Sequence, residues 1–206
     1  MARAGHLRTG RLLSAACRLI LVGMMGSGKS TVGRLLSRRT GWPLHDNDEL
    51  VLRLFDATPR QILASDGEAR LRAAESEALA MGLEAPAPCI VGAAGGTILD
   101  ESNRRQLRSA GIVVWLRASP AIVAKRAMGA KHRPWLDTGG EQWIRDAIDQ
   151  RNPLYASVAD VTVEADGRAP AKIAAEILEQ LRAVGFCPDR LPRVDQLRRV
   201  PREPPA

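Results

Sequence analysis

The sequence is poor in aromatic residues, has no long apolar run and holds only three cysteines. Aromatic side chains make up 3% of its 206 residues, so a folded core must rely on aliphatic side chains. No apolar run approaches the roughly 18 residues that span a bilayer, and we expect no membrane partner. Cys17, Cys89 and Cys187 are scattered and form no C-x-x-C pair. This pattern argues against a disulfide framework or a zinc site and favours a reducing compartment, the cytoplasm.

Positive charge gathers at the two ends of the chain. Of the formal net charge of +7, residues 1–18 contribute +4 and residues 185–206 contribute +2, which leaves the part between them near neutral. That part also lacks the interleaved aromatic and basic residues of single-strand binders, so we expect no nucleic-acid partner. We interpret residues 1–17 as a basic, flexible extension, with a targeting segment as the alternative. The proline- and arginine-rich end, 185–206, is typical of a disordered tail.

Against this background one motif is clear. Residues 23–30 read Gly-Met-Met-Gly-Ser-Gly-Lys-Ser and match the phosphate-binding loop G-x-x-x-x-G-K-[ST] in full. An apolar segment at 18–22 precedes the loop, and a helix-forming segment at 31–39 follows it. A strand, this loop and a helix together form a cradle for phosphate groups. The sequence therefore predicts a site for a nucleoside triphosphate.

The chemistry of such a loop assigns roles to its residues. Backbone amides bind the β-phosphate, the lysine bridges the β- and γ-phosphates, and the hydroxyl that follows the lysine binds Mg²⁺. Lys29 is therefore a candidate catalytic residue, and Ser30 is a candidate metal ligand. The expected nucleotide contacts of the loop are Gly26, Ser27, Gly28, Lys29, Ser30 and Thr31.

Short apolar segments alternate with helical ones along the chain. The expected strands are 18–22, 42–45, 89–91, 112–116 and 161–163. The expected helices are 31–39, 49–55, 58–65, 68–83, 100–109, 119–127, 141–151 and 169–184, with a mobile loop at 128–140. This alternation predicts a single α/β domain whose parallel sheet is covered on both faces. Ligands are then expected beyond the carboxyl ends of the strands.

Acidic residues that assist a bound metal must come from the segment after the first helix. The later strands at 90–91 and 112–116 do not end in a carboxylate, whereas that segment ends in Asp46-Asn-Asp48. Residues at i and i+2 of an extended segment share a face, so both carboxylates are expected in one cleft. Asp46 would act on Mg²⁺ through a water, and Asp48 would accept a hydrogen bond or proton from an attacking hydroxyl. The alternative is that one of them only caps the next helix.

Signatures of other nucleotide-binding proteins are absent from the sequence. It contains neither the guanine-binding string Asn-Lys-x-Asp nor the transporter string Leu-Ser-Gly-Gly-Gln. A molecular switch and a transport ATPase are therefore disfavoured. A kinase that acts on a small molecule is favoured.

Several further motifs occur in order and carry a family resemblance. They are Trp-Pro before Asp-x-Asp, then Asp-Gly-Glu-x-x-x-Arg, Arg-Pro-x-Leu, Arg-x-Pro-Leu-Tyr and Asp-Gly-Arg-x-Pro. Together with the phosphate-binding loop, they resemble the shikimate kinase family across residues 18–184. The resemblance implies transfer of the γ-phosphate of ATP to the 3-hydroxyl of shikimate, in the chorismate and aromatic amino-acid pathway, with ATP and Mg²⁺ as cofactors.

The resemblance also implies an architecture. It is a three-layer αβα fold of the nucleoside-monophosphate-kinase type, with five parallel strands in the central sheet. A substrate-binding region is expected near 49–83 and a mobile lid near 128–138. The expected partner is the small-molecule substrate alone, and we expect a monomer.

Family roles carry over to matching positions on the substrate side. Asp48 matches the acid that holds the hydroxyls of shikimate, and Arg72 and Arg151 match two arginines that bind its carboxylate. Gly95 and Gly96 match glycines whose backbone approaches the substrate. The side-chain chemistry agrees, because two rigid guanidinium forks select an anionic substrate over a neutral cyclitol.

Family roles on the nucleotide side fall on three more arginines. Arg133 matches the lid arginine, which is a candidate catalytic residue because it would neutralise charge on the transferred phosphoryl group and exclude water. Arg126 and Arg168 match positions that flank the adenine.

Three residues depart from the family pattern. Ala94 replaces the first glycine of a triplet and would be strained if its φ were positive. Leu71 replaces a phenylalanine, and Trp135 replaces a leucine in the lid. The first two motivate one alternative, a related kinase for another polyol or hydroxy acid. A second alternative is a non-catalytic, nucleotide-binding regulatory homologue.

Overall fold

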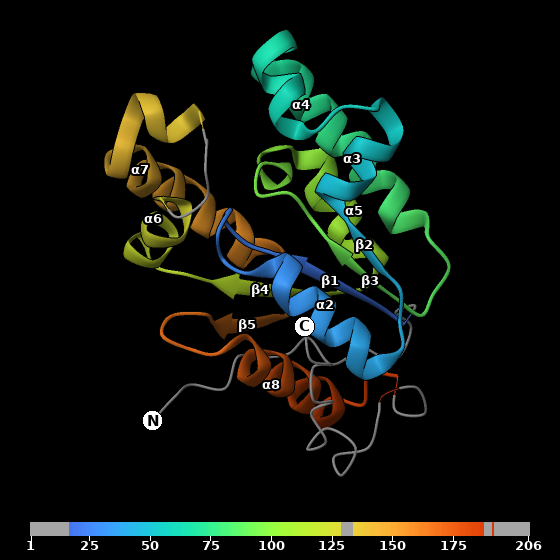
Figure 1. The fold of residues 1–206 in the computed structure, drawn as a ribbon. Helices are drawn as coiled ribbons and strands as arrows, with labels where there is room; N and C mark the ends of the chain where they lie inside the picture. The colour runs from blue at the N-terminus through green and yellow to red at the C-terminus, as the bar shows by residue number, and fades with distance from the viewer. Residues whose placement is uncertain (1–16, 129–133, 188–190, 192–206) are drawn as a thin grey trace, which may run out of the picture.

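The computed structural model describes residues 17–128, 134–187 and 191. Its centre is a sheet of five parallel strands, which confirms the predicted fold class (Figure 1). The strands lie in the order β2-β3-β1-β4-β5, so β1 lies between β3 and β4, where the strand order changes direction. Ligands bind at this position in parallel sheets. The strands are β1 (Arg18–Val22), β2 (Leu44–Asp46), β3 (Cys89–Gly92), β4 (Ile112–Arg117) and β5 (Val161–Glu164).

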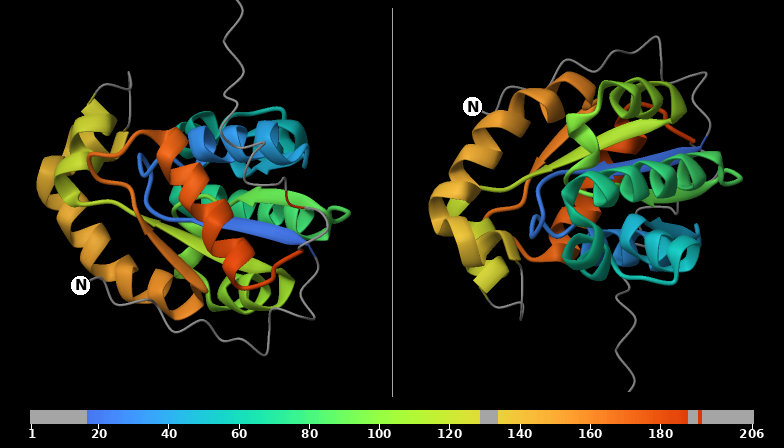
Figure 2. Two further views of the ribbon diagram at one scale, coloured as in Figure 1. Left: turned by 90° about the horizontal axis from the view of Figure 1, so that it is seen from below. Right: turned by 90° about the horizontal axis from the view of Figure 1, so that it is seen from above.

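Helices cover both faces of the sheet (Figure 2). On one face α2 (Lys29–Thr40) packs with α8 (Pro170–Ala183), and on the other α5 (Glu101–Ala110) packs with α7 (Pro134–Val158). The remaining elements pack near the ends of the strands: α3 (Asn47–Phe55) and α4 (Pro59–Glu84) on each other, α6 (Pro120–Met128) on α7, and the 3₁₀ turn η1 (Thr97–Leu99) on α5. Within the described ranges, no helix is both long enough and apolar enough to cross a membrane.

The core is aliphatic, as the shortage of aromatic residues requires. Leu19, Ile20 and Leu21 of β1 are fully buried, and β3 and β4 are almost entirely buried as well. Strands covered on both faces are expected to be continuous apolar runs, and these are. A second, smaller cluster joins α3 to α4 and consists of Leu50, Val51, Ile62, Leu71, Ala74 and Ala78.

The helices near the cavity follow local capping signals. The side chain of Thr58 accepts a hydrogen bond from the Gln61 amide and starts α4. The break expected at Asp66-Gly67 is confirmed, because Gly67 has φ 79° and ψ −179° inside α4. Asp46 caps α3, so this helix begins at residue 47, two residues earlier than expected.

The helix α7 differs most from the expectation. We expected a loop at 128–140 and a helix only over 141–151, but the chain is helical over 134–158 with a break at Gly140. Pro153 lies inside this helix. Ile148 and Tyr155 are 3% and 1% exposed, so burial of one face maintains the helix through the proline. Residues 129–133 of the expected lid lie outside the described part.

The two ends of the domain are joined, which corrects the expectation for the cysteines. Cys17 and Cys187 form a disulfide bond with their Cα atoms 5.8 Å apart, and Cys89 is a buried free thiol. Phe186 and Leu191 are 0% and 7% exposed, so the first residues of the expected tail pack on the core. The rest of that tail and residues 1–16 lie outside the described part.

Candidate active site

The loop between β1 and α2 forms the phosphate cradle at the carboxyl ends of the strands. Gly28 precedes α2 with φ 102°, a left-handed conformation that favours glycine. The helix then begins at Lys29 and directs the positive end of its dipole to the loop. Lys29 Nζ donates hydrogen bonds to the carbonyls of Gly23 (2.7 Å) and Met24 (3.0 Å). The ammonium group is therefore held within the loop.

Arg126 of α6 braces the same loop. Its Nη1 donates to the carbonyls of Gly26 (3.0 Å) and Ser27 (3.1 Å), and its Nη2 approaches the carbonyl of Ala165 at 3.5 Å. The guanidinium thereby links the loop to the segment after β5. This contact was not foreseen, since the resemblance assigned Arg126 to the adenine.

A cavity of about 790 Å³ extends from the loop to α3 and α4. This volume is typical of sites for small molecules. Ala94 and Leu71, the two departures from the family pattern, line it. Most predicted site residues line it too, namely Gly26, Ser27, Gly28, Lys29, Ser30, Thr31, Asp46, Asp48, Arg72, Gly95, Gly96, Arg126 and Arg151.

Of the two remaining predicted arginines, only Arg168 is described, and it is not among the residues that line the cavity. Arg133 lies outside the described residues. Arg168 forms an ion pair with Glu176 of α8 and donates to the carbonyl of Glu164. Its contact with adenine stays a prediction. Helix α8 contributes Pro170, the last residue of the Asp-Gly-Arg-x-Pro motif, and Ile173. Sequence reasoning missed Ile173, because it belongs to no motif.

The two predicted acids have different local roles. Asp46 is 7% exposed, and its Oδ1 accepts a hydrogen bond from the amide of Asp48 at 3.1 Å. Asp46 is therefore the residue that caps α3. The argument from an extended segment is wrong here, because the chain is already helical at Asn47. Both acids nevertheless line the cavity.

Arg72 of α4 lies between two carboxylates. Its Nη1 is 2.7 Å from Glu75 Oε2, and its Nη2 is 2.8 Å from Glu68 Oε1. Burial alone would lower the pKa of Arg72, but these two ion pairs raise it. A Cβ atom at position 96 would lie 1.9 Å from Arg72 Nη1, so Gly96 is what allows the guanidinium to pack against the loop.

Glu75 is a site residue that sequence reasoning missed. It is 6% exposed and lines the cavity. Burial raises the pKa of Glu75, the nearby Arg72 opposes this, and Asp48 adds to it. The signal that could have revealed Glu75 is its place three residues after Arg72, a spacing at which helical side chains meet.

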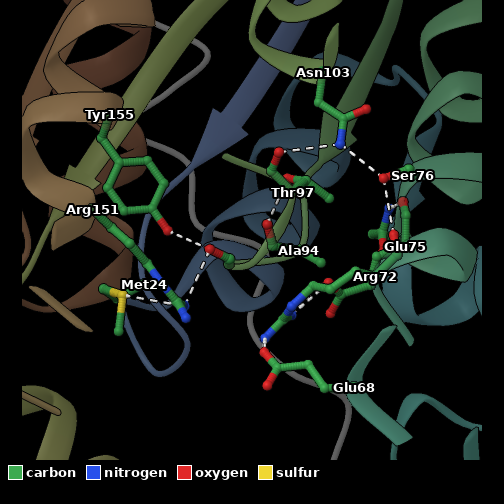
Figure 3. A network of polar contacts seen from close by, with 12 residues as sticks. Met24, Glu68, Arg72, Glu75, Ser76, Ala94, Thr97, Asn103, Arg151 and Tyr155 are labelled. Carbon is green, nitrogen blue, oxygen red and sulfur yellow. Dashed lines mark hydrogen bonds and ion pairs between the residues drawn. The ribbon is translucent and has the colours of Figure 1, made fainter. Parts of the chain in front are cut away.

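Arg151 of α7 faces the cavity from the side opposite Arg72 (Figure 3). It is 4% exposed, and its Nη1 lies 3.4 Å from the carbonyl oxygen of Gly95 and 3.9 Å from Met24 Sδ. Its guanidinium carbon lies 5.7 Å from the centroid of the Trp143 ring. Burial lowers the pKa of Arg151. Its buried Nε has no hydrogen-bond partner in the described part of the chain.

The cavity therefore combines two kinds of binding site. At one end lies a loop built to hold a triphosphate. At the other end lie two guanidinium groups, those of Arg72 and Arg151, with the carboxylate of Asp48 among the lining residues. Guanidinium forks match the geometry of a carboxylate. The arrangement suits transfer of a phosphoryl group to a hydroxyl of a small anion.

Comparison with known proteins agrees with this chemistry. The family model described as "Shikimate kinase" matches residues 25–182. The shikimate kinase of Pseudomonas paraeruginosa is 39% identical over 165 residues, which are 80% of this chain and 95% of that protein. The shikimate kinase of Moorella thermoacetica is 38% identical over 165 residues, with 80% of this chain and 94% of that protein covered.

A solved structure extends the match to three dimensions. Shikimate kinase from Acinetobacter baumannii in complex with shikimate superposes with a TM-score of 0.78 and 32% identity, covering 86% of this chain and 99% of that one. The chain belongs to the shikimate kinase family.

Proposed function

We propose that this protein transfers the γ-phosphate of ATP to the 3-hydroxyl of shikimate. The observation that carries the proposal is a single cavity that joins the phosphate-binding loop to the two guanidinium groups of Arg72 and Arg151. Shikimate is a small, hydroxylated carboxylate, so it fits the charge and the donors of the second end. Family membership supports the same reaction.

On the donor side, the loop binds the phosphates of ATP. Amides of Gly26, Gly28 and Lys29 would hold the β-phosphate. The ammonium group of Lys29, which here donates to two loop carbonyls, would bind the β- and γ-phosphates. Arg126 supports the loop from α6. Arg133 lies outside the described residues, and its role over the phosphates stays a prediction from the family resemblance.

Ser30 and Asp46 are the residues that would hold Mg²⁺. Among the described residues, no group of three or more His, Cys, Asp or Glu side chains could hold a metal ion. Mg²⁺ is usually bound by one or two carboxylates together with substrate phosphates, and Asp46 and Ser30 would supply one carboxylate and one hydroxyl. A Cβ atom at Gly92 would lie 3.5 Å from Asp46 Oδ2, an ordinary contact distance, so the carboxylate lies directly beside the end of β3. The ion would neutralise charge on the phosphates when bound.

On the acceptor side, three charged residues orient the substrate. Arg72 and Arg151 bind its carboxylate, and Asp48 accepts a hydrogen bond from the attacking hydroxyl. The backbone of Gly95 and Gly96 forms the wall between them. Transfer then depends on alignment of the hydroxyl with the γ-phosphate, since positioning and electrostatics supply most of the catalysis in this reaction class.

Another hydroxy acid is the second candidate acceptor, and the methyl group of Ala94 is the observation that favours it. Ala94 lines the cavity where the family has glycine. It is not among the described residues with positive φ, so the substitution causes no backbone strain. Its effect is therefore limited to the shape of the wall.

We further propose that the protein works as a monomer in the cytoplasm, where ATP is available, with small molecules as its partners. A disulfide such as that between Cys17 and Cys187 is rare in this compartment, so the proposed location rests on the nucleotide and not on the cysteines. The position of the excess positive charge, at the ends of the chain rather than on the domain, argues against a nucleic-acid partner. Light scattering after size-exclusion chromatography tests the monomer.

A coupled assay of ADP release tests the reaction. Purified protein is given ATP, Mg²⁺ and either shikimate, gluconate or a neutral cyclitol, with Lys29→Met as the inactive control. We expect release with shikimate, at least about a hundredfold loss in Lys29→Met because an essential phosphate contact is missing, and no release with the cyclitol. Release with gluconate but not shikimate would instead favour the second candidate, and no release with any acceptor would favour a regulatory homologue.

A further inference from the structure

A buried side-chain amide connects two walls of the cavity at its acceptor end, the end lined by Arg72 and Arg151. One wall is α4, which carries Arg72, and the other is the loop of Gly95 and Gly96. Asn103, in the first turn of α5, is 1% exposed. Its Nδ2 donates one hydrogen bond to Ser76 Oγ of α4 (2.8 Å) and one to the carbonyl of Thr97 in η1 (3.1 Å). Figure 3 shows this amide between the two elements. Asn103 is in none of the motifs that identified the site.

Each arm of this network ends at a cavity residue. Ser76 Oγ donates to the carbonyl of Arg72 (2.9 Å), one helical turn before it. Thr97 Oγ1 donates to the carbonyl of Ala94 (2.7 Å), and the Thr97 amide donates to the same carbonyl (3.2 Å). The amide of Asn103 therefore lies two hydrogen bonds from the backbone of a substrate arginine and from the loop opposite it.

The two walls are in direct contact at Gly96. A single Cβ atom at Gly96 would lie 1.9 Å from Arg72 Nη1 and 2.8 Å from Glu75 Oε2. The guanidinium thus packs directly on the loop backbone. A small shift of α4 against the loop would displace the guanidinium from the position that a carboxylate needs, and such errors of about 1 Å are costly in binding and catalysis.

We propose that Asn103 is a positioning residue for the acceptor, because its two hydrogen bonds fix the distance between Arg72 and the wall formed by Gly95 and Gly96. The inference rests on the proposed function, since it assumes that Arg72 binds the substrate carboxylate. Asn103 itself does not touch the substrate and acts through Ser76 and the η1 turn.

The experiment compares two variants that break the hydrogen-bonded link between Ser76, Asn103 and Thr97 with one variant that only weakens the packing of α5. Asn103→Ala removes both donors, and Ser76→Ala removes one acceptor while Asn103 stays. Leu107→Val is the matched control, since Leu107 is a fully buried residue on α5, one turn further along. The Michaelis constants for shikimate and for ATP and the melting temperature are measured for all three.

We expect the KM for shikimate to rise about fivefold to tenfold in both link variants, because the arginine is misplaced, while the KM for ATP changes less than about twofold. The variant that combines Asn103→Ala with Ser76→Ala should raise the KM for shikimate by less than the two single effects combined, because both substitutions remove the same connection. Leu107→Val should lower only the melting temperature. If Asn103→Ala does not fold, the KM for shikimate of the milder variant Ser76→Ala tests the proposal.

Two failures can be told apart. If the wild-type protein turns over shikimate but both link variants keep its KM, the role of Asn103 is purely structural and the inference is overturned. If the wild-type protein shows no turnover of shikimate, the proposed function is overturned, and the inference that rests on it falls as well.

Discussion

At the scale of single residues, the acceptor end holds an unusual concentration of charge. Glu75 and Arg151 are 6% and 4% exposed, and Arg72 pairs with Glu75 at the same cavity. A buried charge is tolerated only when it is paired, and Glu75 is paired with Arg72 at 2.7 Å. Burial still raises the pKa of Glu75, so its ionised form is costly in the folded protein.

Glu75→Gln should change the pH dependence of stability. A raised folded-state pKa means that, between the ordinary value of 4.5 and the folded value, the folded protein binds more protons than the unfolded chain. The contribution of Glu75 to stability therefore falls as the pH rises through this window, with a slope of at most about 1.4 kcal/mol per pH unit. The glutamine variant lacks this slope. Urea unfolding of both proteins between pH 4.5 and 7.5 measures the difference.

The matched control for this prediction is Glu68→Gln. Glu68 pairs with the same guanidinium, but its side chain is 57% exposed, so water already solvates its charge. We expect this variant to keep the wild-type slope. Parallel pH profiles for wild type and Glu75→Gln would contradict the prediction, whatever constant offset separates them.

Sequence reasoning predicted the site residues that belong to a recognisable motif. The loop lysine was named from the phosphate-binding motif, Asp48 from its place after a strand, and Arg72 and Arg151 from the family resemblance. All four line one cavity. Glu75 and Asn103 were missed, because a carboxylate or an amide on a helix usually points to solvent. Only the fold reveals that these two are buried and which groups they contact.

At the scale of elements, the break in α4 separates two helical segments that both contribute to the cluster with α3, Ile62 from the first and Leu71 from the second. Only the second segment carries Arg72, which lies beside the loop of Gly96. Gly67 joins them at φ 79° and ψ −179°, a conformation that is essentially restricted to glycine. The direction in which Arg72 projects thus depends on one backbone position.

Gly67→Ala should destabilise the protein by about 1–3 kcal/mol, the cost of holding a side chain in this backbone region. Crowding makes no contribution, because a Cβ atom at Gly67 would have no heavy atom within 4 Å. The comparison is Gly41→Ala at the end of α2, with φ 74° and ψ 4° and equally open surroundings. Non-glycine residues tolerate that left-handed conformation better, so it should cost only about 1 kcal/mol. Urea unfolding measures both, and equal losses would contradict the argument.

Element boundaries were predicted where a local signal existed. Thr58 and Asp100 cap their helices as expected, and the break at Gly67 was expected from Asp-Gly. The course of α7 was not predicted, because Pro153 and Gly140 are helix breakers by local rules. Burial of its apolar face on the sheet stabilises the helix despite these residues, and this stabilisation cannot be predicted from the local sequence.

At the scale of the whole molecule, the cavity and the disulfide bond lie at opposite ends of the strands. The cavity is at the carboxyl ends of the strands. The disulfide between Cys17 and Cys187 is at the amino end, because Cys17 directly precedes β1. Sequence reasoning could not pair two cysteines 170 residues apart, since only the folded chain brings them together. The same fold buries Phe186, which edge-packs against Trp42, and so extends the domain past the expected boundary at 184.

Replacing Cys17 and Cys187 together by serine should therefore lower stability without lowering activity. A bond that closes a loop of 170 residues restricts the unfolded chain, and the chain-entropy model puts the stabilisation at up to about 5 kcal/mol. Urea unfolding of the oxidised protein, of the protein with dithiothreitol and of the double variant should give one stable and two equally weakened forms. Cys89→Ala, which removes the buried thiol, controls for the loss of a cysteine alone. Because the bond is remote from the cavity, kcat and both KM values should stay within about twofold of wild type. If the reduced protein is as stable as the oxidised one, packing of the core alone holds the two ends of the chain together. If the double variant loses turnover, the disulfide at the amino ends of the strands is coupled to the cavity at their carboxyl ends.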